Sequence, residues 1–173
     1  MTHKFYHVAF RCKDAAETVK FYTEALGLRF THALTNDIVP SVKMFSPHIH
    51  IFFELPDGSN MAFFEVPLSP PKEKDKNTPV WVDHTAFEVK SFDELVGHKA
   101  RLEAHGIDVI GPIDHDFAHS IYFFDPNNLR LEVTWPHPEG GFAEKNQREA
   151  MSILQAWEER KAKKDWTPPP GYN

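Results

Sequence analysis

The sequence has only one cysteine, no excess of positive charge and no long apolar run. Cys12 is the single cysteine in 173 residues, so no internal disulfide can form, and we expect a cytoplasmic protein. Lys and Arg total 19 against 25 Asp and Glu, and the net charge of −6 argues against a nucleic-acid partner. No apolar run approaches the roughly 18 residues of a membrane span. The start, MTHKFYHVAF, lacks the apolar stretch of a signal peptide.

Two residue types are abundant instead, with 11 His and 15 Phe. Hydrophobic residues make up 41% and charged residues 25%, as is ordinary for a globular domain with its own core. The His and Phe residues fit either surface histidines around a Phe-rich core, or nitrogen ligands inside aromatic walls. The positions of these residues along the chain distinguish a Phe-rich core from a ligand site.

The most informative feature is an internal repeat. The sequence His-Val-Ala-Phe at 7–10 recurs as His-Thr-Ala-Phe at 84–87. Each copy precedes a stretch with helical spacing of apolar residues. Glycines follow both stretches, Gly27 and Gly106, and lie 20 and 22 residues after their histidines. The two halves of the chain therefore keep nearly the same register.

The beginnings of the two helical stretches also match. The first begins with Asp14 and has Glu17 three residues later, and the second begins with Ser91 and has Glu94. This spacing is that of a capping box, in which each side chain accepts a backbone hydrogen bond at the helix start.

Three strand-like runs follow each helix. The predicted strands cover 28–34, 42–54 and 60–67 in the first half, and 107–110, 117–124 and 129–135 in the second. Each half is thus a βαβββ module, and half a sheet cannot bury its own face. We expect an α+β fold in which the two modules form a cupped, open β-barrel with helices outside.

The whole chain, 1–173, is predicted to be a single domain. Module 1 covers about 3–67, a proline- and lysine-rich linker covers about 68–79, and module 2 covers about 80–135. A C-terminal helix and tail occupy 136–173.

Strand alternation predicts which side chains face the cup. Apolar neighbours that pack under the helices send His7 and His84 to the concave face. Glu132 faces the cup because Leu131 and Val133 point away, and the matching run Phe-Glu-Val at 64–66 sends Glu65 inward by the same reasoning.

These four side chains predict a metal site. One inward histidine is usually an ordinary core residue, but two at equivalent repeat positions with two glutamates are not. Burying carboxylates without a counter-charge is costly, and a divalent cation supplies that charge. We therefore expect His7, His84 and Glu132 to bind a metal ion, with Glu65 as an additional ligand whose participation stays open.

On these residues the chain resembles the vicinal oxygen chelate superfamily, which includes glyoxalase I, bleomycin-resistance proteins and the type I extradiol dioxygenases. The resemblance covers about 3–135. In the first half it rests on His7-x-x-x-Arg11 and on the run Phe-Tyr-Thr-Glu-Ala-Leu-Gly at 21–27. This half is typical of the fold and says little about the reaction.

The second half resembles the extradiol dioxygenase signature more specifically. His115 is followed at the expected spacing by Ile-Tyr ending at Tyr122, by Asp-Pro at 125–126 and by the closing Glu132. Asn128 departs from the pattern, since the signature has Gly or Pro there, although Asn also tolerates a left-handed turn. The resemblance implies that His115 is the acid–base group, with His119 as the alternative, and that Tyr122 hydrogen-bonds to substrate or oxygen.

The implied reaction is ring cleavage of a catechol-like aromatic diol by O2. Two histidines and one carboxylate leave positions open on Fe(II) for the diol and O2, so iron is the expected cofactor. Mn(II), Ni(II) and Zn(II) are the other possible ions.

Two alternatives remain open on the same scaffold. A glyoxalase I-type lyase, isomerase or epimerase would use four ligands, His7, Glu65, His84 and Glu132, and shuttle a proton through one glutamate. Arg11 stands where such enzymes contact the substrate. A binding protein of the bleomycin-resistance kind would need no metal.

The segment after Pro138 lies outside the resemblance. Residues 143–162 have helical spacing with an apolar stripe formed by Ala150, Ile153, Leu154 and Trp157. The stripe could pack on its own domain, cover the cup as a lid or join a second copy, and we expect a homodimer because a cupped sheet with open edges is a liability alone.

Overall fold

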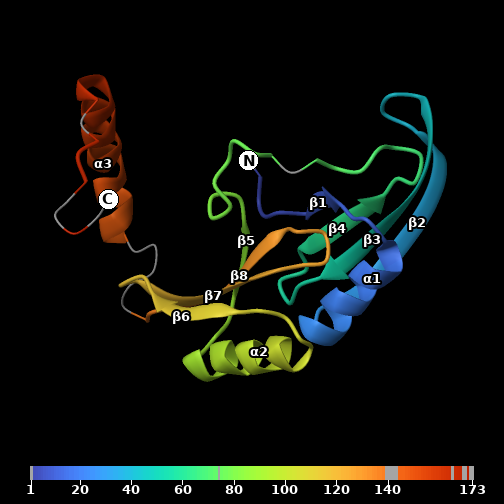
Figure 1. Ribbon diagram of the computed structural model, residues 1–173, viewed down its shortest axis with the longest axis horizontal. Helices are drawn as coiled ribbons and strands as arrows, with labels where there is room; N and C mark the ends of the chain where they lie inside the picture. Colours follow the sequence, from blue (N-terminus) through green and yellow to red (C-terminus); the bar gives the residue numbers. More distant parts are fainter. Residues whose placement is uncertain (1, 74, 139–143, 165, 169–170, 172–173) are drawn as a thin grey trace.

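The computed structural model describes residues 2–73, 75–138, 144–164, 166–168 and 171, with the side chains of 144–148 excepted. Parts of the predicted C-terminal tail therefore lie outside the described residues. The chain forms two four-stranded sheets and three α-helices, an α+β fold that is not a closed barrel (Figure 1). None of the helices in the described part of the chain has the length and apolar character that a membrane span requires.

The first sheet has the order β1-β4-β3-β2. Its strands are β1 (His7–Arg11), β2 (Arg29–Val39), β3 (Met44–Glu54) and β4 (Asn60–Glu65). Helix α1 (Ala15–Lys20) continues into a π-helical segment, η1 (Phe21–Ala25), before β2 begins.

The second sheet has the matching order β5-β8-β7-β6. Its strands are β5 (Thr85–Glu88), β6 (Ile110–Asp114), β7 (Ala118–Phe124) and β8 (Arg130–Pro136), with helix α2 (Phe92–Ala104) between β5 and β6. The first and last strands of each module pair in parallel. The predicted βαβββ repeat is therefore confirmed.

The helix boundaries follow the predicted capping chemistry. The side chain of Asp14 accepts a hydrogen bond from the backbone N–H of Glu17 at 2.7 Å, and that of Ser91 accepts one from Glu94 at 3.1 Å. Gly27 and Gly106 end the two helical stretches with φ values of +82° and +75°, a left-handed conformation that favours glycine.

Strand β6 begins three residues later than predicted. Ile107 and Val109 are apolar because they pack against the core as the chain leaves α2, and not because they belong to the sheet. The ladder begins at Ile110 and is interrupted before Ile113, where Pro112 has no N–H to donate.

One core joins the two modules. The buried apolar side chains of both sheets and both helices form a single cluster. At the junction the hydroxyl of Tyr22 donates to the carboxylate of Asp125 at 3.2 Å, and the Asn127 amide donates to the hydroxyl of Thr18, also at 3.2 Å. Burial raises the pKa of Asp125, although hydrogen bonds from Asn127 and Leu129 oppose that shift. The turn that holds Asp125 therefore anchors module 2 on α1.

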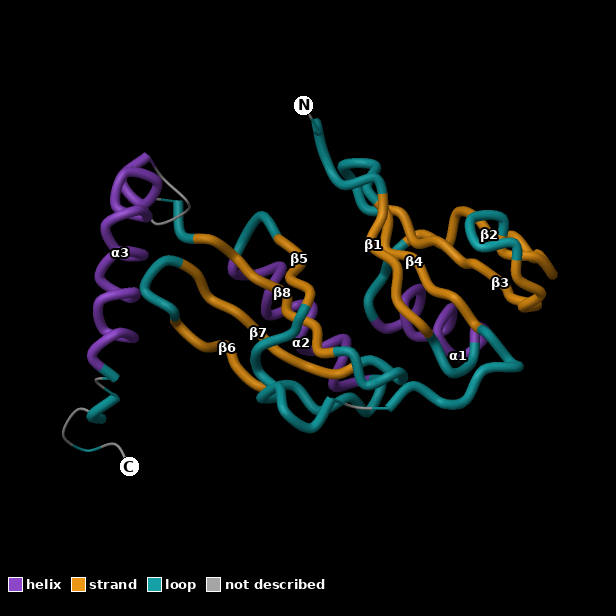
Figure 2. The backbone as a smooth tube through the Cα atoms, turned by 90° about the horizontal axis from the view of Figure 1, so that it is seen from above, coloured by secondary structure: helices purple, strands orange, loops and turns teal. Residues whose placement is uncertain are grey.

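The sheets are arranged so that β1 and β5 are the inner edges. Both views place these two strands toward the middle of the molecule, facing one another, with β2 and β6 at the outer ends (Figures 1 and 2). Helices α1 and α2 lie on one side of the sheets, and no helix of the described residues covers the opposite faces (Figure 1). Helix α3 (Glu144–Lys163) stands apart from both sheets.

Candidate metal centre

The uncovered face of the second sheet brings together His84 and Glu132. His84 immediately precedes β5, and Glu132 lies opposite Ala86 in the β5–β8 ladder. The Nε2 atom of His84 is 3.0 Å from an Oε atom of Glu132. Glu132 is 8% exposed, so its carboxylate is held largely away from water.

Hydrogen bonds orient both members of this pair. The Nδ1 atom of His84 lies 3.0 Å from the carbonyl of Val82, which can only accept, so Nδ1 carries the proton of the neutral ring. The hydroxyl of Ser120 donates to the other carboxylate oxygen of Glu132 at 2.5 Å. In the neutral ring, Nε2 and the Glu132 oxygen that faces it are then both acceptors. Their close approach calls for a positive charge between them, either a proton or a metal ion.

Tyr122 and His115 lie beside this pair. Tyr122 is directly opposite Glu132 in the β7–β8 ladder, and its ring is 6.2 Å from that of His84. The Tyr122 hydroxyl is 2.8 Å from the Nε2 atom of His115. Burial, followed by the negative charge of Glu132, raises the pKa of Tyr122. The phenol is therefore a hydrogen-bond donor at neutral pH.

His119, the predicted alternative to His115, is on the other face of the sheet. It lies opposite Trp135 in the ladder, and its ring contacts Phe92 of α2 at 5.2 Å. Ser120, the next residue in β7, donates to Glu132, and Tyr122 contacts His115, so both of these side chains lie on the face opposite to that of His119. The suggestion that His119 could act at this site is therefore wrong.

His7 lies on the uncovered face of the first sheet, as predicted. It is exposed, and its ring is 5.8 Å from that of His50 and 5.7 Å from that of Phe52. Within the described residues, His7 does not form a group with His84 and Glu132 in which all ligand atoms lie within 4.8 Å of one another. His7 is the first residue of β1, the edge strand that faces β5. Its ring is not in the close contact that joins His84 to Glu132.

His50 was missed in the sequence. It stacks on Phe64 with a centroid distance of 3.6 Å, and its buried Nε2 atom has no hydrogen-bond partner among the described residues. Burial, followed by repulsion from His7, His48 and His32, lowers the pKa of His50 to about 4. The alternation of histidines at 48 and 50 in β3 was the available signal, since residues two apart share a face.

Glu65 does not face the cup, and the predicted direction is wrong. In the β1–β4 ladder Ala9 lies opposite Ala62, whereas in the second module Ala86 lies opposite Glu132. The counterpart of Glu132 is therefore Ala62. Glu65 falls on the helix side, where its carboxylate accepts a hydrogen bond from the backbone N–H of Ala15 at 2.7 Å.

Arg11 is also engaged elsewhere. Its guanidinium donates to the backbone carbonyls of Pro70, Ser69 and Val66 at 2.6, 2.9 and 3.3 Å, which fastens the linker to the first module. Arg11 and Glu65 line a cavity of about 710 Å³ between the linker and the two modules. None of His7, His84 and Glu132 lines that cavity, so it is separate from the site described above.

The comparisons with known proteins agree with this architecture. A family model described as the Glyoxalase/Bleomycin resistance protein/Dioxygenase superfamily matches residues 4–133.

The chain belongs to this superfamily.

Among solved structures, a domain of the superfamily from Frankia sp. EAN1pec is 21% identical with a TM-score of 0.65, over 79% of this chain and 100% of that one. The fosfomycin resistance protein FosX from Listeria monocytogenes, complexed with Mn(II) and sulfate, is 19% identical with a TM-score of 0.58, over 83% and 100%. A glyoxalase family protein from Enterococcus faecalis is 25% identical with a TM-score of 0.56, over 76% and 96%. No curated protein gives a significant match.

Members of this superfamily are often metalloenzymes, and the FosX structure contains Mn(II). The likenesses to the Frankia domain and to FosX are below 25% identity and concern the fold.

Proposed function

We propose that the chain is a metal-dependent, extradiol-type dioxygenase that cleaves the ring of a catechol-like aromatic diol with O2. His7, His84 and Glu132 would hold the divalent ion. The observation that carries this proposal is the 2.8 Å contact between the Tyr122 hydroxyl and His115 Nε2, directly beside the His84–Glu132 pair.

His84 and Glu132 present donor atoms that fit a divalent ion. His84 presents a lone pair at Nε2 because its Nδ1 proton is directed at Val82, and Glu132 presents a carboxylate oxygen 3.0 Å away. A carbonyl that orients a histidine in this way is a common support of metal ligands. His7 would join the pair from the neighbouring strand, which requires its exposed side chain to move toward them.

Iron(II) is the ion that this set of two imidazoles and one carboxylate favours, with Mn(II), Ni(II) and Zn(II) as alternatives. Bound there, the ion would lower the pKa of a coordinated diol and bring diol and O2 into contact. Three protein ligands suffice for this chemistry. The helix-side position of Glu65 supports a three-ligand site, because its carboxylate is bonded to the backbone of α1.

Tyr122 and His115 would handle protons and hydrogen bonds at the substrate. His115 accepts through Nε2 when the phenol donates to it, so it is placed to take a proton from a diol hydroxyl that displaces the phenol. Tyr122, with its raised pKa, would remain a donor toward oxygen atoms of the substrate. The guanidinium of Arg130, 4.5 Å from the Tyr122 ring centroid, packs on that ring and restricts its orientation.

The position of Glu65 argues against the glyoxalase I-type alternative. That reaction would use Glu65 as a fourth ligand or proton shuttle, yet its carboxylate caps α1 on the helix side of the sheet. The hydrogen bonds of Arg11 to the linker also leave it without the substrate contact that this alternative gave it. A binding protein without metal is distinguished by the experiment below.

The test is oxygen uptake by protein that has been purified without oxygen and reconstituted with Fe(II), using a panel of substituted catechols. We expect one O2 consumed per ring and a yellow ring-opened product. A His105→Gln variant serves as the matched histidine control, because His105 is exposed at the end of α2 and takes no part in the site. Stable iron binding without oxygen uptake for any diol would refute the proposed reaction.

A further inference from the structure

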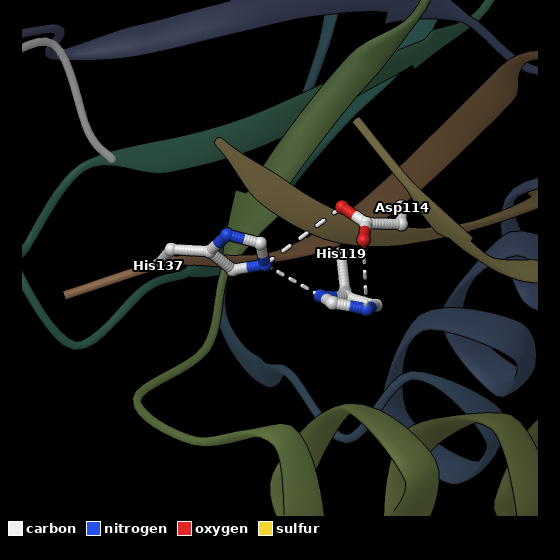
Figure 3. A group of neighbouring side chains, drawn as sticks. All are labelled: Asp114, His119 and His137. Atoms are coloured by element: carbon white, nitrogen blue, oxygen red, sulfur yellow. Dashed lines mark hydrogen bonds and ion pairs between the residues drawn. The ribbon is translucent and has the colours of Figure 1, made fainter. Parts of the chain in front are cut away.

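A second group of candidate ligands lies on the opposite face of the second sheet. It consists of Asp114 at the end of β6, His119 in β7 and His137 just after β8 (Figure 3). Because His119 faces α2 while its neighbour Ser120 binds Glu132, the sheet separates this group from the site described above.

The side chains converge on one point. The Nδ1 atom of His119 is 2.6 Å from the Nε2 atom of His137, and both rings face the carboxylate of Asp114 (Figure 3). The His119 Nε2 atom is 3.8 Å and the His137 Nε2 atom 4.0 Å from the Asp114 oxygens. Within the described residues this is the one group of three or more possible ligands whose ligand atoms all lie within 4.8 Å of one another.

With both imidazole rings neutral, the group would lack a positive charge. The Nδ1 atom of His137 lies 3.1 Å from the carbonyl of Asp116, so it carries the proton of the neutral ring and leaves Nε2 bare. His119 must then donate through Nδ1 to that bare nitrogen, which leaves its own Nε2 bare toward the Asp114 carboxylate. Neutral rings therefore direct a nitrogen lone pair at an anion, an arrangement that a cation between the three groups would stabilise.

We propose that Asp114, His119 and His137 form a second metal site that binds a divalent ion such as Zn(II). Two imidazoles and one carboxylate are ordinary zinc ligands, and water could complete a tetrahedron. The Asp114 side chain is 58% exposed, so an ion can enter from solvent.

The surroundings hold the ligands in place. The carbonyl of Asp116 fixes the tautomer of His137, and the backbone N–H of Asp116 donates to an Asp114 oxygen at 2.9 Å. Trp135 and Phe92 flank the ring of His119, with centroid distances of 5.9 and 5.2 Å.

The site would act as a clamp. Its ligands come from β6, from β7 and from the segment after β8, so a bound ion ties the outer edge of the second sheet to the chain that leads toward α3. Binding to the folded state alone raises stability by mass action. Zinc should therefore raise the midpoint of thermal unfolding as well as bind.

The experiment isolates this site by removing the first one. Full-length His84→Ala/Glu132→Gln protein, stripped of metal, is titrated with Zn(II) by calorimetry and its thermal unfolding is followed with and without Zn(II). We expect one ion per chain and a rise in the unfolding midpoint. His137→Gln and Asp114→Asn in this background should each weaken binding by at least about tenfold and remove the rise.

The matched control is His105→Gln in the same background. His105 follows the C-terminus of α2, about 20 Å along that helix from Phe92, which contacts the cluster. It should bind zinc as tightly as the background protein does. If the background protein binds no zinc, so that a proton alone occupies the cluster, the proposal is overturned. Equal zinc affinity in His137→Gln, Asp114→Asn and the background protein would overturn it as well.

Discussion

The carboxylate of Glu65 accepts a hydrogen bond from the backbone N–H of Ala15 at 2.7 Å, which ties the end of β4 to the first turn of α1. An anionic acceptor at a helix N-terminus satisfies a free N–H and interacts favourably with the helix dipole. Glu65 therefore stabilises the fold of module 1 and does not belong to the proposed metal site.

Glu65→Gln should reduce the free energy of unfolding by about 0.3–1 kcal/mol, the usual range for a charge at a helix N-terminus, because Gln can still accept the hydrogen bond but carries no charge, and should leave metal content unchanged. Denaturant unfolding and metal analysis measure the two quantities. Glu17→Gln is the control, since Glu17 also lies in the first turn of α1 but is exposed. Loss of bound metal in Glu65→Gln, with Glu17→Gln unaffected, would restore the four-ligand alternative.

The proposed ligands should each be required for metal binding. His7→Ala, His84→Ala and Glu132→Ala should weaken binding of the divalent ion at least a hundredfold, because loss of even a supporting residue outside the ligand shell costs about 10–100-fold. Metal content is measured after dialysis of protein that was purified without chelator, with any ion at Asp114, His119 and His137 removed by His137→Gln. Full occupancy in His84→Ala would show that the assignment is wrong.

His115 and Tyr122 should affect turnover and not metal content. His115→Ala should lower kcat by about 10²–10⁴-fold if it is the acid–base group, and Tyr122→Phe should have a similar but smaller effect. Both variants should retain iron. Rates equal to those of the unaltered protein in both variants would remove these residues from the mechanism even if the metal site is correct.

The stability of the protein should fall in acid because of His50. The pKa of His50 is lowered to about 4 in the folded chain, whereas it is about 6.5 in the unfolded chain. Between these two pH values the unfolded chain binds a proton at His50 and the folded chain does not. Stability from this residue is fully present above pH 6.5 and declines as the pH falls toward 4. Denaturant unfolding at pH 7 and pH 4.5 should therefore show a smaller loss for His50→Gln than for the unaltered protein, and equal losses would contradict the assignment.

Helix α3 should mediate self-association. Ile153, Leu154 and Trp157 are 63%, 50% and 47% exposed, so the apolar stripe does not pack on its own domain in the described structure. A second copy would cover it, and the mass measured by light scattering at micromolar concentration should be that of a dimer. Ile153→Asp should shift the mass toward the monomer. A monomeric mass for the unaltered chain would count against the homodimer.

The repeat in the sequence was sufficient to predict the module, both helix starts and the pairing of His84 with Glu132. These features depend on local spacing and on strand alternation, which the sequence contains directly. The direction of Glu65 could not be obtained in this way. The tripeptides that end with Val66 and Val133 look equivalent, but the backbone ladder aligns Ala62 with Glu132. Strand register depends on cross-strand pairing, and a one-residue shift exchanges the two faces.

The group of Asp114, His119 and His137 was beyond sequence reasoning for a related reason. Its members come from three segments with no common period, and they meet because β6 pairs with β7 and the pairing of β7 with β8 continues to His137. The backbone N–H of His137 donates to the carbonyl of Phe117 at 2.9 Å, which brings its ring beside the start of β7. Such contacts follow from tertiary structure alone.

The origin of the oxygen atoms in the product tests the central claim most directly. Iron-reconstituted protein should be supplied with a cleaved catechol and ¹⁸O₂, and the ring-opened product analysed by mass spectrometry. Extradiol cleavage predicts that both atoms of one O2 molecule appear in the product. The account would be contradicted if iron is bound but no diol consumes oxygen, or if the product formed contains no label.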